Sequence, residues 1–207
     1  MLSKDDLRAA IARTNRGIAA NATDKQEIAS IIAQIEDRNP TSDPLSALDL
    51  LEGDWRLLYT TSQELLGIDR VPLAQLGNIY QCVRAQNDRI YNIAEIKGLP
   101  YFESLISVVA SFTPAAKTAE DAAAGQLKRR VNVKFNRAVI GLQRMLGYES
   151  PAQYIQQLEQ TEKMSLFKGI DFAINAERQK GWLEITYLDK DLRIGRGNQG
   201  SLFVLTK

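Results

Sequence analysis

The pattern of hydrophobic positions changes its period once along the chain, close to residue 53. Before that point, apolar residues recur at the spacing of one helix face, and the clearest set is Ile28, Ile31, Ile32 and Ile35. Ser3 with Asp6 and Thr23 with Gln26 both fit helix capping boxes. The pattern therefore predicts a helical segment over residues 1–52, whose narrow apolar stripes need another surface to pack on.

From residue 55 onward, hydrophobic and polar residues alternate with a period of two, which is typical of half-buried strands. This alternation places Trp55 and Tyr59 on one side of the first strand. It is clearest over residues 127–137, where Val131, Val133 and Phe135 share a face. Further strands are predicted at 79–85, 89–96, 105–112, 162–167, 171–177, 182–187, 192–195 and 201–206, with a short helix over 151–158.

Turn signals separate these runs, and we find no helical crossover of the kind that joins parallel strands. Residues 86–88 and 197–200 each fit a hairpin turn. Roughly nine short strands at this spacing fit an antiparallel meander, and closing a meander into a barrel removes its exposed edges. The prediction is a mainly β chain, with an antiparallel β-barrel over residues 53–207 that follows the helical segment 1–52.

Composition then narrows the range of functions. The chain has 207 residues, a net charge of +1 and no histidine. Without histidine, Ser-His-Asp enzymes, Cys-His enzymes and the usual kind of zinc site are excluded. The small net charge gives no drive toward nucleic acid. We expect a protein that is not an enzyme and needs no metal or cofactor, although Asp, Glu, Lys and Tyr could still support acid–base chemistry.

Membrane and export signals are weak in the sequence. No stretch reaches the roughly 20 apolar residues that a helix needs to cross a bilayer. Asp5 and Asp6 do not fit an acid-poor transit peptide, and no apolar signal core stands at the N-terminus. The expectation is a cytosolic chain, or a mature form whose presequence has been left out. The single cysteine, Cys82, rules out an internal disulfide and is expected to be a structural thiol.

Gly53-Asp54-Trp55 forms a G-x-W triplet at the entrance to the first strand. The glycine permits a sharp entry, and the tryptophan can plug the end of a barrel. A similar triplet closes the barrel base of lipocalins, under an arginine from the last strand. Here Arg193 or Arg196 is positioned to stack on the indole. The alternative is an ordinary core tryptophan with two surface arginines.

Two longer segments carry a resemblance to a known family. Residues 51–62 read L-x-G-x-W-R-L-L-Y-T-T-S, and residues 187–205 read Y-L-D-x-D-L-R-I-x-R-G-x-x-G-x-L-F-V-L. Together with the helical lead-in, they resemble the plastid-lipid-associated protein or fibrillin (plastoglobulin) family over nearly the whole chain. The resemblance implies a lipocalin-like barrel that associates with thylakoid membranes or lipid globules and holds lipids such as quinones, carotenoids or fatty acids.

The same resemblance sets expectations for source and location. With no presequence, a cyanobacterial-type member is expected, on the cytoplasmic side of the thylakoid membrane or on lipid globules. A mature plastid form would instead lie in the chloroplast stroma or on plastoglobules. The chain would hold a hydrophobic small molecule, contact lipid peripherally and bind no nucleic acid. The sequence leaves its oligomeric state open.

Asp189 and Asp191 flank Lys190 just before the last two strands. Paired carboxylates could bind a hard cation or act as acid and base. We favour a turn role, in which Asp189 caps backbone N–H groups, pairs with Arg193 or Arg196, and helps to close the barrel with Gly53 and Trp55. No third oxygen ligand has the spacing that a calcium loop requires.

Arg129 and Arg137 share the parity of the apolar face of residues 127–137. One of them could sit at the barrel mouth and meet a carboxylate or headgroup. The alternative is a β-bulge that turns each arginine outward, or a side chain that snorkels along the wall. The run Lys128-Arg129-Arg130, with Lys134 and Arg137, forms a basic patch that could also touch an anionic membrane, although a solvated strand face is the default.

The leading functional hypothesis is a non-enzymatic barrel that carries an isoprenoid or acyl chain. Its predicted ligand-binding residues are Trp55, Tyr59, Arg129, Val131, Val133, Phe135 and Phe203. Contact with a membrane would occur through the N-terminal helices or residues 99–112. The alternative is a structural or scaffold protein of lipid particles or thylakoid complexes, whose barrel is filled by its own side chains.

Overall fold

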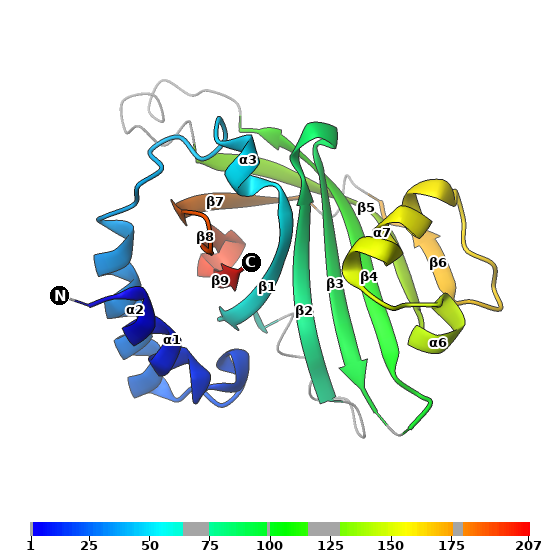
Figure 1. Cartoon of the computed structure of the whole chain (residues 1–207), viewed down its shortest axis with the longest axis horizontal. Coiled ribbons are helices and arrows are strands. Elements are labelled where there is room, and N and C mark those ends of the chain that lie inside the picture. The colour runs from blue at the N-terminus through cyan, green and yellow to red at the C-terminus, as the bar shows by residue number, and fades with distance from the viewer. Residues whose placement is uncertain (1, 64–74, 99, 116–128, 176–179) are drawn as a thin grey trace.

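Antiparallel strands wrap into a barrel that carries helices on two opposite sides (Figure 1). The computed structural model describes residues 2–63, 75–98, 100–115, 129–175 and 180–207. Its strands are β1 (Gly53–Thr60), β2 (Gln75–Arg84), β3 (Arg89–Lys97), β4 (Ser104–Pro114), β5 (Arg130–Leu142), β6 (Ile170–Ala173), β7 (Lys180–Leu188), β8 (Leu192–Gly197) and β9 (Leu202–Thr206). Its α-helices are α1 (Lys4–Ala12), α2 (Ala22–Glu36), α3 (Leu48–Leu51), α6 (Gln143–Leu146) and α7 (Pro151–Gln160).

Eight strands close the barrel in the order β1-β2-β3-β4-β5-β7-β8-β9, and β9 pairs back with β1. Every one of these pairings is antiparallel. The predicted mainly β architecture, with its helical lead-in, is therefore confirmed. The first and last strands are neighbours, so the two segments that carried the family resemblance meet at the barrel seam.

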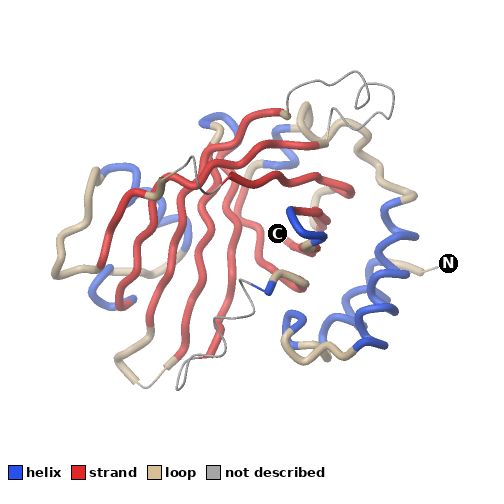
Figure 2. The backbone as a smooth tube through the Cα atoms, turned by 180° about the vertical axis from the view of Figure 1, so that it is seen from behind, coloured by secondary structure: helices blue, strands red, loops and turns tan. Residues whose placement is uncertain are grey.

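Strand β5 has different partners along its two halves. Residues 130–134 pair with β7, whereas residues 137–140 pair with the short strand β6. The sequence predicted this strand only as far as residue 137, and so missed the second half. Because β6 rather than β7 borders that half, the barrel wall divides at the middle of β5 (Figure 2).

The division coincides with a β-bulge at Asn136. Phe135 lies opposite Ala110, but Arg137 lies opposite Val109, so two steps on β5 match one step on β4. A bulge of this kind reverses which side chains face inward. Val131, Val133 and Phe135 consequently line the barrel, while Arg137 turns to the outer surface. This is the outward-turning bulge that the sequence left open as an alternative.

A second register shift, in β1, separates two residues that were expected to share a face. Leu57 lies opposite Leu205, but Tyr59 lies opposite Val204. Trp55 and Leu57 belong to the interior cluster, whereas Tyr59 packs in the outer cluster beneath α1 and α2. The prediction that Trp55 and Tyr59 share one side of the strand is wrong, and Tyr59 does not line the barrel.

Helices α1 and α2 cover the outer face of β1, β8 and β9. The predicted capping box of Ser3 and Asp6 is present, and the predicted apolar face of α2 is buried: Ile28, Ile31, Ile32 and Ile35. The second box, however, is formed by Asn21 and Asp24 rather than by Thr23 and Gln26. Since the apolar stripes of both helices pack on the barrel, they are not available to a membrane.

Helices α6 and α7 cover the outer face on the opposite side, over β2 to β5. The buried residues of this layer include Cys82, Leu105, Val109, Val139 and Tyr154. Cys82 is the buried thiol that was expected, and burial raises its pKa. The strand predicted at residues 162–167 is wrong, because this segment is a connection from α7 to β6.

Candidate functional site

Trp55 fills the closed end of the barrel. Its side chain is fully buried, and its indole Nε1 donates a hydrogen bond of 2.8 Å to the Leu51 carbonyl. The guanidinium carbon of Arg193 lies 5.0 Å from the centre of the indole ring, and the Lys207 ammonium lies 4.6 Å from it. Gly53 enters the strand with a φ of 129°, a conformation that side chains other than glycine rarely adopt.

Of the two candidate arginines, only Arg193 therefore reaches the indole. Arg196 faces outward and forms an ion pair of 2.7 Å with Glu36 on α2. Sequence reasoning missed Lys207, because a terminal lysine has no pattern that would place it on a ring. Two cations therefore lie close to the Trp55 ring, and each can interact favourably with its π-electrons.

Asp189 holds the turn between β7 and β8. Its carboxylate accepts hydrogen bonds from the backbone N–H groups of Asp191 and Leu192, at 3.0 and 2.9 Å, as a turn aspartate should. Its cationic partner is Lys4 on α1, at 2.8 Å, and not Arg193 or Arg196, so that part of the prediction is wrong. Burial opposes ionisation of Asp189, but the hydrogen bonds from Lys4 and neighbours outweigh it and lower the pKa of this carboxyl.

The barrel interior is lined mainly by apolar side chains. Five of the seven predicted ligand-binding residues contribute to it: Trp55, Val131, Val133, Phe135 and Phe203. Tyr59 lies outside, as described above. Arg129 precedes β5, with a half-buried side chain, and its carbonyl accepts a hydrogen bond of 2.8 Å from the Ile185 N–H.

The accessible part of this interior lies along β4 and β5. On β4 the outward residues Leu105, Ser107 and Val109 are buried beneath α6 and α7. The inward residues Ile106 and Val108, although apolar, are only half-buried. In an ordinary barrel the inward face is the better covered one. Here the relation is reversed, because the wall divides beside β5.

The same inward face continues onto β6. Ile140 lies opposite Ile106 on β4 and opposite Ile170 on β6, and Phe172 lies opposite Ala138. Ile140, Ile170 and Phe172 are all exposed, Ile170 to 63%. We call this accessible apolar surface the open flank, made of Ile106, Val108, Ile140, Ile170 and Phe172.

Two loops and helix α6 meet at one end of the open flank and add further exposed apolar residues. We call them the apolar rim: Tyr101, Phe102, Met145, Leu166 and Phe167. Leu166 and Phe167 are 84% and 88% exposed. Helix α6 is the neighbour of the loop that carries Tyr101 and Phe102, since the Gln143 N–H donates to the Glu103 carbonyl at 2.8 Å and the Arg144 guanidinium lies 5.8 Å from the Tyr101 ring. Among the described residues, eight of the nine exposed large hydrophobic side chains belong to the open flank or the rim.

One group of polar side chains lies inside the barrel, on β8, β2 and β3. Arg193 donates a hydrogen bond to the side-chain oxygen of Gln81, and the Gln81 amide donates to Asn92 at 3.1 Å. Sequence reasoning missed Gln81 and Asn92. The available signal was their inward parity on two strands joined by a hairpin, where they lie directly opposite each other.

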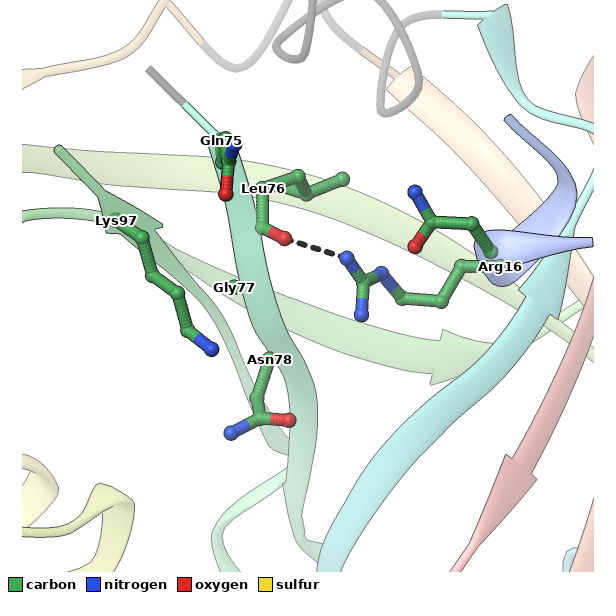
Figure 3. Close-up of a pocket in the computed structure, with 7 residues that line it drawn as sticks. Arg16, Gln75, Leu76, Gly77, Asn78 and Lys97 are labelled. Carbon is green, nitrogen blue, oxygen red and sulfur yellow. Dashed lines mark hydrogen bonds between the residues drawn. The ribbon is translucent and has the colours of Figure 1, made fainter. Parts of the chain in front are cut away.

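Two surface pockets are polar instead. The first, of about 410 Å³, lies where Asn15 and Arg16 approach β2, and Arg16 donates a hydrogen bond to the Leu76 carbonyl there (Figure 3). The second, of about 510 Å³, lies beside α7 and includes Tyr91, Arg137 and Glu159. A hydrophobic ligand needs mainly apolar area, so the open flank is the better candidate site.

Two arginines of the predicted basic patch, Arg130 and Arg137, have protein partners. Arg130 pairs with Glu184 at 3.1 Å and stacks on Trp182, whose ring centre lies 4.4 Å away. Arg137 forms two hydrogen bonds with Asp171, at 3.0 and 2.6 Å. Lys128 lies outside the described residues. The patch is therefore partly neutralised, and it does not by itself point to an anionic membrane.

Comparison of the sequence with known proteins finds a family model and several similar plastid proteins. The PAP_fibrillin family model matches residues 1–206. The chain is 31% identical over 218 residues to the probable plastid-lipid-associated protein 2, chloroplastic, of Arabidopsis thaliana, covering 94% of this chain and 66% of that one. It is 31% identical over 217 residues to the chromoplast-specific carotenoid-associated protein of Cucumis sativus, covering 94% and 64%.

The light-induced protein, chloroplastic, of Solanum tuberosum is 30% identical over 230 residues, covering 100% of this chain and 67% of that one. The chain thus spans about two thirds of the length of these relatives. No solved structure matches it significantly. Within the part of the chain that the structure describes, no helix is long and apolar enough to cross a membrane.

Proposed function

Because the chain belongs to the PAP_fibrillin family, we propose that it holds a hydrophobic small molecule against the open flank while the apolar rim contacts a lipid surface. Two of the relatives named above are a plastid-lipid-associated protein and a carotenoid-associated protein, which supports association with lipid globules. The finer statement, that a lipid, quinone, carotenoid or fatty acid enters the barrel, rests on the geometry of the inner face. The role needs no chemical step.

The observation that carries the proposal is the reversed burial of β4. Val109, on the outer face, is 4% exposed, whereas its neighbour Val108, on the inner face, is only half-buried. Contiguous apolar surface left open to water is unusual in a protein that acts alone. Covering roughly 200 Å² of it would stabilise a complex by about 5 kcal/mol before the costs of association.

The position of the rim connects the two halves of the proposal. Phe102, Leu166 and Phe167 extend from loops rather than from a flat sheet, so they can enter a fluid lipid layer without a matching protein surface. Arg144 on the Tyr101 ring provides the pairing of aromatic and basic groups that is common at the level of headgroups. A molecule could then pass between the lipid layer and the open flank without crossing water.

Purification from a photosynthetic host without detergent tests the carrier role. We expect lipid extraction and mass spectrometry to find a hydrophobic molecule bound to the wild-type chain. Val108→Trp, which fills the open flank, should reduce it several-fold. A wild-type chain that carries nothing, or a variant that carries as much as wild type, would favour the alternative of a structural protein with a filled barrel.

Flotation with vesicles tests the rim. The double variant Leu166→Ser with Phe167→Ser should float at least about fivefold less with galactolipid vesicles than wild type does. Leu48→Ser is the matched control, because Leu48 is an exposed leucine on α3, away from the rim. Equal flotation of wild type and the rim variant would show that another surface meets the lipid.

A further inference from the structure

Arg193 is a guanidinium buried inside the barrel without an acidic partner. Its side chain is 2% exposed. It shares the inward face with Leu205 and Leu57, as the strand register shows. No Asp or Glu occupies an inward position on the described strands, and the carboxylate nearest in sequence, Asp191, pairs with Lys4 and Arg8 on the outer surface. Burying an unpaired charge is costly, so this arrangement calls for a partner.

The partners that Arg193 does have are neutral. Its guanidinium lies over Trp55 and donates a hydrogen bond to Gln81. Lys207 on the same indole adds a second positive charge nearby. Burial lowers the pKa of Arg193 to about 9, which still leaves it protonated at neutral pH. Arg193 therefore keeps its positive charge at the closed end of the barrel, in surroundings of low polarity.

Unused hydrogen-bond donors accompany this charge. Among the described residues, Arg193 donates only through Nη2, and the Asn92 amide nitrogen has no acceptor. Gln81 and Asn92, at inward positions of β2 and β3, are half-buried, so these two side chains are less covered than Arg193. Donors without acceptors, beside the apolar side chains of the barrel interior, are what an anionic or carbonyl headgroup would require.

The polar group also lies on a direct line to the open flank. In the strand register Asn92 lies opposite Val108, Val108 opposite Ala138, and Ala138 opposite Phe172. A row of neighbouring inward positions thus runs from Gln81 and Asn92, across β4 and β5, to Phe172 on β6. A single chain lying along this row would place one end near Arg193 and the other at Phe172, on the open flank.

Resting on the proposed function, we infer that Arg193, Gln81 and Asn92 anchor the carboxylate of a long-chain fatty acid whose hydrocarbon chain lies along the open flank. A carboxylate is the anion whose two oxygens match the fork of an arginine. It also accepts from the Asn92 amide, and it is small enough to sit at the end of a single hydrocarbon chain. Carotenes and quinones carry no negative charge, so they would leave the guanidinium uncompensated.

Fluorescence titration with cis-parinaric acid and its methyl ester tests this assignment, because the two probes differ only in the anion. Wild type should bind the acid at least about tenfold more tightly than the ester. Arg193→Gln should remove most of that preference while leaving affinity for the ester unchanged. Arg196→Gln is the matched control on the same strand, since Arg196 faces outward to Glu36, and it should keep the full preference.

Asn92→Leu provides a second variant that leaves the contact between Arg193 and Trp55 in place, should Arg193→Gln fail to fold. It too should lower affinity for the acid and spare the ester. Equal affinity of wild type for acid and ester would overturn the anchor while leaving the proposed carrier role intact. If neither probe bound, both the anchor and the carrier role would be wrong.

Discussion

Val108 and Val109 are neighbours of the same residue type on opposite faces of β4, and they differ in what covers them. Val109 packs beneath α7 with the outer cluster, whereas Val108 faces the barrel interior and stays half-buried. The comparison extends along the sheet: the outer faces carry the two helical layers, and the open flank carries none. The outer faces and the closed end are therefore well covered, whereas the open flank, where we propose that a ligand binds, is not.

The largest expected difference in unfolding free energy is between the alanine variants of Trp55 and Phe172. Trp55→Ala should lower the free energy of unfolding by about 4 kcal/mol, because it removes a fully buried indole and the ring shared by two cations. Phe172→Ala should cost less than about 1 kcal/mol, since that side chain is 44% exposed. Urea denaturation measures both. Similar losses would mean that the open flank is part of the core.

Substitution of Asp171 tests how much the ion pair on the outer face, where β6 pairs with β5, contributes to stability. Its carboxylate binds Arg137 through two hydrogen bonds and accepts a third from the Met164 N–H at 2.6 Å. Burial alone would raise the pKa of Asp171, but these hydrogen bonds outweigh it and lower the pKa below its ordinary value. Asp171→Asn should cost about 3 kcal/mol at neutral pH, because it leaves Arg137 without its anion.

The pH dependence of the stability lost in Asp171→Asn follows from the lowered pKa of Asp171. A carboxyl with a lowered pKa in the folded state contributes stability above its unfolded pKa of about 3.9, and loses it as the pH falls further. The difference in urea midpoint between wild type and Asp171→Asn should therefore stay constant from about pH 7 to about pH 5 and shrink below about pH 4. A difference independent of pH would show that the Asp171 charge is not what Arg137 responds to.

The two valines provide the smallest and most local test. Val109→Phe should destabilise the fold by about 2 kcal/mol, because the outer face has no space for a larger ring. Val108→Phe should change the unfolding free energy by less than about 0.5 kcal/mol, since its ring can occupy the open flank. The order of the two values, measured side by side, matters more than their size. A reversed order would contradict the reversed burial of β4.

The sequence was sufficient for features that local pattern controls. The face of α2, the cap at Ser3 and the hairpin between β2 and β3 follow from spacing, capping chemistry or turn residues. The approach of a late arginine to Trp55 followed instead from the likeness of the G-x-W triplet to that of lipocalins. The choice between Asn21 and Thr23 as the cap of α2 was not predictable, because both can accept the hydrogen bond and the packing of the helix decides between them.

The features that create the candidate site depend on pairing between distant strands. The bulge at Asn136 and the register shift before Tyr59 have no local signal, yet each reverses a face. The exchange of β7 for β6 beside β5 could not be read from either strand alone. Gln81 and Asn92 were polar residues in otherwise ordinary strands until the register placed them beside Arg193.

Tryptophan fluorescence tests most directly whether a hydrophobic molecule enters the barrel. The chain has two tryptophans: Trp55 inside, and Trp182 on the outer surface beside Arg130. In Trp182→Phe, a fatty acid with a nitroxide near its carboxyl end should quench Trp55 in a saturable, one-site manner, whereas Trp182 in Trp55→Phe should be unaffected. Quenching of Trp182 alone, or no saturable quenching of Trp55, would contradict the account.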